Sequence, residues 1–304
     1  MYIPEDKIRD VLTYESLIPV IRQALMDYSA GAVDQPPRSV LRVKDQQGEP
    51  SGWFAVMPAI AGEVMGVKTV TFFPGNSSSG LHTHMAIIEL LRRSTGEPLA
   101  VMDGRLITEM RTAAVSAVAV EALAQPGAKT LGILGSGVQA RSHIEALRLV
   151  WPAFREAGSI RIWSRNPQKA AVLAEETGAV AVAIEEASAC DVVVTVTSAT
   201  EPVLLGKWLS PQSLVVAVGA VGAQLRELDD EVMTGHLIAE SRQGVERESG
   251  DAILSRAEVQ AELGEVLAGK ATLPASGRRV FKSVGMAIED ITAARLVWSL
   301  LESN

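Results

Sequence analysis

The chain has 304 residues, 47% of them hydrophobic, which is enough for about two domains with sizeable cores. Its 28 lysines and arginines and 36 aspartates and glutamates give a net charge of −8, which argues against a nucleic acid as the main partner because no broad basic face would neutralise phosphates. The charged N-terminal residues predict no signal peptide, no apolar run approaches the ~18 residues of a membrane span, and the single Cys190 excludes an internal disulfide. We therefore expect a cytoplasmic protein without a membrane partner.

The first part of the chain, up to the turn-forming Gln125-Pro126-Gly127, has a mixed pattern with strand-like runs at Gly52–Met57, Val64–Phe72 and Pro98–Met102. Small residues after Glu109 predict a closely packed helix that carries Arg111 in its first turn. We expect a mixed α+β domain of residues 1–124 plus 286–304, because the last predicted helix, Met286–Leu301, can return to this region.

The second part, residues 125–285, alternates strands and helices, which is typical of a doubly wound α/β domain of the Rossmann type. The run Asp191–Thr197 is continuously apolar and β-branched, as in a strand of a parallel sheet covered on both faces. The predicted strands are Thr130–Leu134, Ile160–Trp163, Val180–Ile184, Asp191–Thr197, Ser213–Val218 and His236–Ala239, and the predicted helices are Val138–Val150 and Pro167–Glu176.

A glycine-rich motif, Gly135-Ser136-Gly137-Val138-Gln139-Ala140, connects the first predicted strand of this part to its helix. The first glycine permits a tight turn, and the second lets the backbone approach a pyrophosphate. The free N–H groups at the start of the following helix then face the anion. In this context the motif predicts dinucleotide binding, and the alternative is an ordinary tight turn.

The end of the next strand distinguishes between the two nicotinamide dinucleotides. An NAD site usually has an acidic residue here, which binds the ribose 2′-hydroxyl. This sequence instead has Ser164-Arg165-Asn166, in which Ser164 and Asn166 can bond a 2′-phosphate and Arg165 can pair with its charge. We therefore expect NADP(H) to be preferred over NAD(H), with a simple polar turn and helix cap as the alternative.

Three basic residues in the first part suggest a site for a small anion. Lys68 lies within an apolar strand, on the same predicted face as Gly66, and the alternative is a lysine that extends to solvent at a sheet edge. Arg111 in a first helical turn would face the positive end of the helix dipole. This position is unfavourable for a cation unless an anion also lies there. Arg38 follows two prolines in an extended segment. Together these side chains can hold one carboxylate.

Many ordered motifs resemble the ornithine cyclodeaminase/mu-crystallin family over nearly the whole chain, and its mu-crystallin branch fits better than the cyclodeaminases. The motifs are Pro37-Arg38, Val67–Phe72, Ala100–Gly104, Arg111–Ala117, Gly135–Ala140, Ile162–Arg165, Thr195–Pro202, Arg226–Asp230, Glu262–Leu267 and Phe281–Asp290.

The resemblance implies an N-terminal domain that binds substrate and forms a homodimer, next to a Rossmann domain. It also implies that Arg38, Lys68 and Arg111 hold the carboxylate of a small imine or amino acid. His84 matches a family position near the nicotinamide, although a structural histidine is an equal alternative. Further cofactor contacts are implied for two segments, namely Thr197 with Ser198, and the turn that contains Ser283 and Gly285.

One departure from the family bears on the reaction. Cyclodeaminases carry an aspartate after the turn that follows the fifth Rossmann strand, whereas this chain has Val221, which we expect to line the cofactor site. The resemblance thus favours an NADPH-dependent reductase of Δ1-pyrroline-2-carboxylate or Δ1-piperideine-2-carboxylate, with Lys68 as a candidate proton donor. The alternatives are an ornithine cyclodeaminase or alanine-dehydrogenase-like enzyme, and a non-catalytic NADPH-binding protein. The histidine spacing predicts no metal site.

Overall fold

The computed structural model describes residues 1–302, except the side chain of Ser77, as two compact units. Unit 1 comprises Met1–Arg111 and the chain from Met286 onward, and unit 2 comprises Thr112–Gly285. The units divide inside helix α3 (Arg105–Leu123), whereas the sequence analysis placed the division after this helix, at residue 124. Within the described residues, every helix is too short or too polar to cross a lipid bilayer.

In the described residues, unit 1 consists of a mixed sheet, three α-helices and a short 3₁₀ helix, besides the first part of α3. Its remaining elements are β1 (Tyr2–Ile3), α1 (Glu5–Val11), α2 (Tyr14–Ser29), β2 (Val33–Asp34), β3 (Ser39–Lys44), β4 (Pro50–Ala61), β5 (Val64–Phe72), the short 3₁₀ helix Pro74–Ser78, β6 (His84–Arg92), β7 (Pro98–Asp103) and α10 (Ala287–Glu302).

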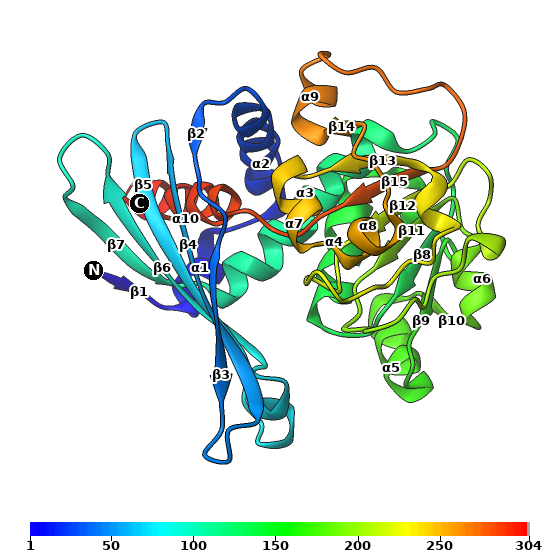
Figure 1. Ribbon diagram of the computed structural model, residues 1–304, viewed down its shortest axis with the longest axis horizontal. Helices are drawn as coiled ribbons and strands as arrows, with labels where there is room; N and C mark the ends of the chain where they lie inside the picture. Colours follow the sequence, from blue (N-terminus) through cyan, green and yellow to red (C-terminus); the bar gives the residue numbers. More distant parts are fainter. Residues whose placement is uncertain (303–304) are drawn as a thin grey trace. The chain divides into compact units, whose positions relative to one another are not determined.

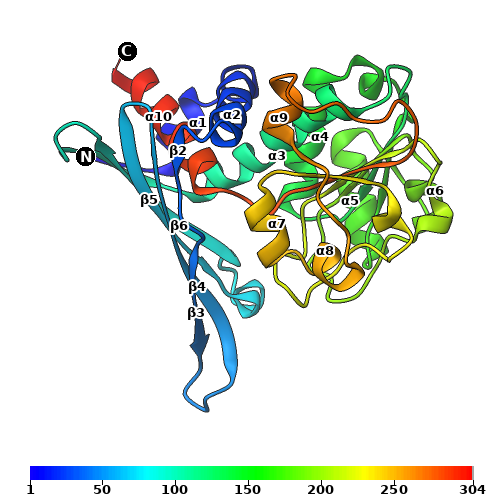
Figure 2. The same cartoon turned by 45° about the horizontal axis from the view of Figure 1, so that its top comes forward.

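The strand order among the described residues of this sheet, sheet A, is β1-β7-β6-β5-β4-β2, and β3 also pairs with β4. Strands β4 to β7 are antiparallel, while β1 lies parallel to β7. Helix α10 packs on β4, β5 and β6, with α2 beside it, as Figures 1 and 2 show. Gly66 on β5 permits this packing, because a Cβ atom there would lie 2.7 Å from the Ile291 side chain and 2.4 Å from the Glu89 carbonyl oxygen.

Unit 2 contains the predicted alternation of strands and helices. Its elements after α3 are β8 (Leu131–Leu134), α4 (Val138–Val150), the 3₁₀ helix Pro152–Arg155, β9 (Ile160–Trp163), α5 (Pro167–Thr177), β10 (Val180–Ala181), α6 (Ile184–Ser188), β11 (Val192–Thr195), the 3₁₀ helix Gly206–Trp208, β12 (Leu214–Ala217), the 3₁₀ helix Val232–Thr234, β13 (His236–Ala239), α7 (Arg242–Glu248), α8 (Gly250–Ser255), β14 (Ala261–Glu262), α9 (Leu263–Leu267) and β15 (Arg279–Lys282).

The strands of unit 2 form a parallel sheet, sheet B, in the order β10-β9-β8-β11-β12-β15-β13-β14 among the described residues (Figure 1). The chain first runs outward from β8 through β9 to β10 and then returns to β11 on the other side of β8. Ligands of doubly wound sheets bind at such a reversal, outside the carboxyl ends of the strands. The predicted α/β fold with a parallel sheet is therefore confirmed.

Local sequence signals account for several bounds of these elements. Helix α5 begins after Asn166, whose side chain accepts hydrogen bonds from two backbone N–H groups, and ends at Gly178 in the left-handed conformation. The strand predicted at Val180–Ile184 ends at Ala181 in the structure, and α6 begins at Ile184. Strand β15, which the sequence analysis did not predict, lies between β12 and β13 and so places a late segment at the centre of this half of the sheet.

Candidate functional site

The glycine-rich loop of unit 2 has the geometry that its sequence predicts. Gly135 follows β8 with a φ of +136°, and a Cβ atom there would lie 2.8 Å from the Val196 carbonyl oxygen. A Cβ atom added at Gly137 would instead project into space that no described atom fills within 4 Å. Because no described side chain caps α4, which begins at Val138, its first N–H groups are available to an anion.

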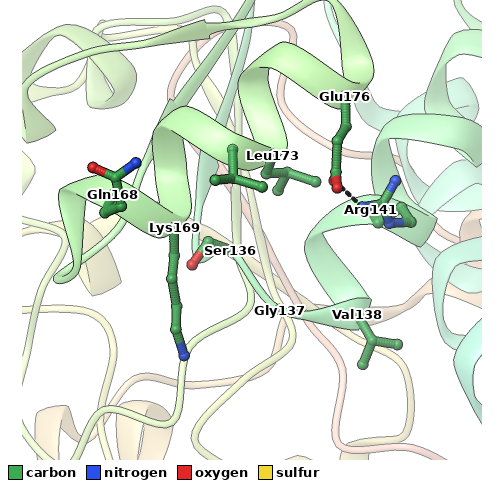
Figure 3. Close-up of a pocket in the computed structure, with 9 residues that line it drawn as sticks. Ser136, Gly137, Val138, Arg141, Gln168, Lys169, Leu173 and Glu176 are labelled. Carbon is green, nitrogen blue, oxygen red and sulfur yellow. Dashed lines mark hydrogen bonds and ion pairs between the residues drawn. The ribbon is translucent and has the colours of Figure 1, made fainter.

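Beside this loop lies a pocket of ≈ 330 Å³ between the first turn of α4 and one side of α5 (Figure 3). The loop contributes to its lining, and Arg141 and Glu176, which form an ion pair, also line it. Residues of the pocket lining include Ser136, Gly137 and Val138 from the loop and Gln168, Lys169 and Leu173 from α5. The open space at Gly137 and the uncapped helix fit a dinucleotide phosphate.

The end of β9 approaches the same loop. The Ser136 hydroxyl donates a hydrogen bond to the Ser164 hydroxyl at 2.8 Å, and Arg165 is exposed. Asn166 uses its side-chain oxygen to cap α5, with distances of 3.0 Å to the Gln168 nitrogen and 3.3 Å to the Lys169 nitrogen. The side chain of Asn166 thus caps α5, and Ser164 lies against the glycine-rich loop.

The sequence analysis missed Lys169, which lies in the first turn of α5 and lines the pocket. In Figure 3 its side chain leaves α5 on the side of Ser136. A cation in the first turn of a helix is disfavoured by the helix dipole unless an anion is nearby. The position of Lys169, in the first turn after the predicted helix start at Asn166-Pro167, was the signal in the sequence that indicates an anion nearby.

Other predicted cofactor residues follow the carboxyl ends of neighbouring strands in sheet B. Thr197 follows β11, Val221 follows β12 and is 40% exposed, and Ser283 follows β15. The Ser283 hydroxyl is buried and donates to Glu240, whose other oxygen accepts the Val284 and Gly285 N–H groups. Ser283 and Gly285 thus belong to a turn held by a buried carboxylate, and Ser198 is exposed beside Thr197.

In unit 1, Lys68 and Arg111 meet at a pair of buried carboxylates. Lys68 Nζ lies 2.5 Å from Asp290 Oδ2, and Arg111 donates to Asp290 Oδ1 at 3.0 Å and to Glu289 Oε2 at 2.7 Å. Lys68 is 2% exposed, Arg111 5%, and both carboxylates 0%. Buried charges of this kind persist in proteins because they are paired and hydrogen-bonded.

The pKa values of this cluster follow from burial and from the neighbouring charges. Burial lowers the pKa of Lys68 to about 8, while Asp290 opposes this shift and Arg111 and Arg38 add to it. Burial raises the pKa of Asp290, but the charges of Arg111 and Lys68 outweigh this effect. The pKa of Asp290 therefore lies below its usual value. Burial, together with Lys68 and Arg111, lowers the pKa of His84 to about 4, and this imidazole is therefore neutral at neutral pH.

The structure corrects one premise about Arg111. Helix α3 begins at Arg105, so Arg111 lies in its second turn and not in its first. Its charge is balanced by Glu289 and Asp290 at the start of α10, in which the sequence analysis recognised a family motif but no role in the cluster. The acidic first turn of the last helix was the signal that could have indicated a cationic neighbour.

The remaining predicted residues of unit 1 lie near this cluster. His84 begins β6 in the register row of Phe72 and so shares the sheet face of Lys68, which lies four register rows away on β5. Arg38 is half-buried, and its charge acts on Lys68. Within residues 1–302, no three histidine, cysteine, aspartate or glutamate side chains are grouped as a metal site would require.

Comparison with known proteins adds four similarities to this geometry, two from sequence and two from solved structures. A sequence profile described as the ornithine cyclodeaminase/mu-crystallin family matches residues 5–304. The ketimine reductase mu-crystallin of Mus musculus is 42% identical over 314 residues, which cover 100% of this chain and 98% of the mouse protein.

Two solved structures share the fold over the whole chain. One is the Δ1-pyrroline-2-carboxylate reductase of Thermococcus litoralis in complex with NADH and L-proline, with a TM-score of 0.90, 32% identity, and coverage of 100% of this chain and 98% of that one. The other is an archaeal alanine dehydrogenase dimer with bound NAD, with a TM-score of 0.92, 28% identity, and coverage of 100% and 96%.

Proposed function

Because the chain belongs to the ornithine cyclodeaminase/mu-crystallin family, we propose that it is an NADPH-dependent reductase of cyclic imines that carry a carboxylate on the imine carbon. Its substrates are Δ1-pyrroline-2-carboxylate and Δ1-piperideine-2-carboxylate, and its products are L-proline and L-pipecolate. The observation that carries this proposal is the buried Lys68, which is paired with Asp290 beside Arg111 and has a pKa of about 8.

The cations of unit 1 bind the substrate carboxylate. Arg111 presents a planar guanidinium group suited to a carboxylate, and Lys68 and Arg38 add positive charge on the same side. Asp290 and Glu289 keep Lys68 and Arg111 in place before the substrate arrives, so binding does not have to order these side chains. His84, which is neutral at neutral pH, faces the same cluster without adding a charge that would repel the imine's proton.

Lys68 is the proton donor. An imine accepts a hydride readily only when its nitrogen is protonated, so the enzyme must hold an acid whose pKa lies near the working pH. The pKa of about 8 satisfies this condition, whereas a solvated lysine, at ~10.4, would hold its proton too tightly. When bound, NADPH supplies the hydride that reduces the imine carbon.

The cofactor is held by unit 2, with the pyrophosphate at the glycine-rich loop and the N-terminus of α4. Ser164 and Arg165, which follow β9, and Lys169, in the first turn of α5, bind the 2′-phosphate, since the end of β9 has a hydroxyl and a cation where an NAD-specific strand end would have a carboxylate. The solved relatives contain NADH and NAD, so the preference for NADPH rests on these three residues of this chain.

The protein forms a homodimer in which unit 1 of each copy contributes the interface. The face of sheet A away from α10 presents an apolar patch of Leu41, Phe54, Val56, Met85 and Ile87, which are brought together by cross-strand register. Leu41 is 60% and Ile87 49% exposed in the single chain. An uncovered apolar sheet face favours association, and the archaeal relative is a dimer.

The test is a steady-state assay of the purified protein that follows the loss of reduced nicotinamide with five- and six-membered cyclic imino acids. We expect NADPH to give a higher kcat/KM than NADH. Lys68→Met should lower kcat by about 10²–10⁴-fold, the usual contribution of a positioned acid. Lys68→Arg, which keeps the charge but holds its proton too tightly, should preserve KM better than kcat.

Lys7→Met is the matched control, because Lys7 lies on α1 with 61% of its side chain exposed. Near-normal kcat in both Lys68 variants would exclude Lys68 as the proton donor. Turnover of pyruvate with ammonia, or release of ammonia from L-ornithine, in the absence of cyclic imine reduction would overturn the proposed reaction.

A further inference from the structure

Unit 2 contains a cluster of buried charges that the proposed mechanism does not use. Glu227, Asp251 and Lys282 are each 0% exposed. They contact residues at the carboxyl ends of β11, β12 and β15, which are neighbours in sheet B. Removing ions from water costs free energy. A buried cluster of two carboxylates and one ammonium group must therefore be stabilised by ion pairs and hydrogen bonds.

Glu227 holds the segment that follows β11. Its Oε1 accepts hydrogen bonds from the Thr197 N–H at 2.7 Å and the Thr197 hydroxyl at 2.6 Å, and its Oε2 accepts one from the Thr195 hydroxyl at 2.7 Å. Burial raises the pKa of Glu227 above its usual value, although Lys282 and the donors from Thr197 and Thr195 oppose that shift. Three converging donors are typical of a site built for a carboxylate ion.

Asp251 and Lys282 complete the cluster. Asp251 Oδ1 accepts the backbone N–H groups of Glu227 and Leu228 at 2.8 and 2.9 Å, which fixes the position of Glu227 itself. Lys282 Nζ lies 3.0 Å from Asp251 Oδ2 and donates to the Gly219 carbonyl oxygen at 2.8 Å. With both carboxylates ionised, these three side chains have a net charge of −1.

The backbone at Gly219 lies in close contact with this cluster. A Cβ atom there would lie 2.2 Å from the Thr197 carbonyl oxygen and 2.6 Å from Glu227 Oε1. Only glycine lets the segment after β12 come this close, so the backbone itself brings the carboxylate and the ends of two strands together.

The location of the cluster suggests its effect on a cofactor. Ligands of doubly wound sheets bind outside the carboxyl ends of the strands. A dihydronicotinamide ring is uncharged and becomes a cation when it gives up its hydride. A fixed negative charge in a dry environment stabilises the cationic form more than the neutral one, and it needs no reorganisation when the charge appears.

We propose that Glu227, with Asp251 and Lys282, gives the nicotinamide site its preference for the oxidised, positively charged form of the cofactor. This rests on the proposed function, in that unit 2 must bind a nicotinamide dinucleotide with its ring at this edge of sheet B. Glu227 acts as a positioning residue through Thr197 and as a fixed charge, and it promotes hydride donation by stabilising the product of that step.

The experiment measures the dissociation constants of NADP⁺ and NADPH for the full-length protein by calorimetry, without any imine. In Glu227→Gln the Kd of NADP⁺ should rise about tenfold relative to that of NADPH, as expected for the loss of one charge at a short distance in a protein interior. Glu227→Asp keeps the charge but shortens the side chain, so its Kd ratio should stay close to that of the unaltered protein. An unchanged ratio in Glu227→Gln, or an equal change in Glu227→Asp, would overturn the proposed role of charge.

Asp191→Asn is the matched control at the opposite end of β11. Its Oδ2 accepts the Lys129 and Thr130 N–H groups and the Thr130 hydroxyl at 2.8 to 2.9 Å, so the same change of carboxylate to amide removes a similar acceptor far from the carboxyl edge. Asp191→Asn should leave the Kd ratio unchanged, and a shift as large as that in Glu227→Gln would contradict the proposal.

If Glu227→Gln fails to fold, Thr195→Val tests the same idea with a substitution of similar size. Removing the hydroxyl donor makes ionisation of Glu227 less favourable, so the Kd ratio should shift in the same direction by about twofold to threefold, and more at lower pH. A ratio identical to that of the unaltered protein at every pH would overturn the proposal. If the unaltered protein bound neither nucleotide, the proposed function would fail, whereas binding of both with an unaffected ratio would exclude the further inference alone.

Discussion

Asp290 accepts from two cations at once, since Lys68 Nζ lies 2.5 Å from its Oδ2 and Arg111 Nε 3.0 Å from its Oδ1. Without this charge, Lys68 would keep its burial and the repulsion from Arg111 and Arg38, and its pKa would fall below about 8. In Asp290→Asn we therefore expect the decline of kcat/KM at high pH to begin about one pH unit lower or more, because the proton donor loses its proton earlier. The pH profile of kcat/KM with a cyclic imino acid checks this.

Asp45→Asn is the control at the residue scale. Asp45 accepts the N–H groups of Gln47 and Glu49 in the exposed turn between β3 and β4, so the same substitution there should leave the pH profile unchanged. Asp290→Glu retains the charge and should restore part of the profile. A profile of Asp290→Asn that coincides with that of the unaltered protein would exclude the proposed control of Lys68 by Asp290.

At the scale of elements, α4 is fastened to α3 by His143, which is fully buried. Its Nε2 lies 2.9 Å from the Ser116 hydroxyl and its Nδ1 2.7 Å from the Gln139 carbonyl oxygen, so Nδ1 donates and Nε2 accepts. Burial lowers the pKa of His143 to about 4, although the hydrogen bond to Gln139 opposes this shift. The histidine, which is neutral at neutral pH, thus links the first turn of α4 to α3.

The stability of the protein should therefore decrease in acid. The folded pKa lies below the unfolded value of about 6.5, so the unfolded chain binds the proton more readily, and stability that is present above about pH 6.5 is lost as the pH falls toward about 4. Between pH 7 and pH 5 this loss amounts to about 2 kcal/mol for His143. The amide in His143→Gln does not titrate. The difference in unfolding free energy between the unaltered protein and this variant should therefore be smaller at pH 5 than at pH 7 by that amount.

Denaturant unfolding at the two pH values measures this difference. His82→Gln, at an exposed position before β6, is the control and should change in parallel with the unaltered protein. A constant difference between His143→Gln and the unaltered protein at both pH values would mean that His143 is not the group that senses acid.

At the scale of the whole molecule, the apolar patch on sheet A predicts a dimer of twice 32.3 kDa. Ile87 lies in the row Val56–Thr69–Ile87 of this patch, so Ile87→Asp would bury a charge between the two copies and should produce a monomer. Light scattering coupled to size-exclusion chromatography measures the mass. Val180→Asp, at an exposed position of β10 in unit 2, should remain dimeric, and a dimeric Ile87→Asp would exclude this face as the interface.

Local patterns in the sequence were sufficient for much of unit 2. The bounds of α4, β9 and β13 agree with the predicted ones, because the spacing of apolar residues along the chain indicates a helix or a buried strand. The glycine-rich loop was also recognisable, since its turn and its close approach to an anion require glycine at fixed positions. Family membership followed from ordered motifs along the chain.

The tertiary structure decided how the charges are paired. Arg111 and Asp290 are 179 residues apart in sequence, yet their side chains are 3.0 Å apart, and nothing local in either segment specifies this contact. Likewise, β15 enters sheet B between β12 and β13 and brings Lys282 to Asp251. Sequence patterns report which face of an element is buried, whereas the partner of a buried charge depends on which distant elements pack together. The sequence by itself therefore determined the family, the dinucleotide loop and the cations, and only the folded chain determined the carboxylates that set their charge and position.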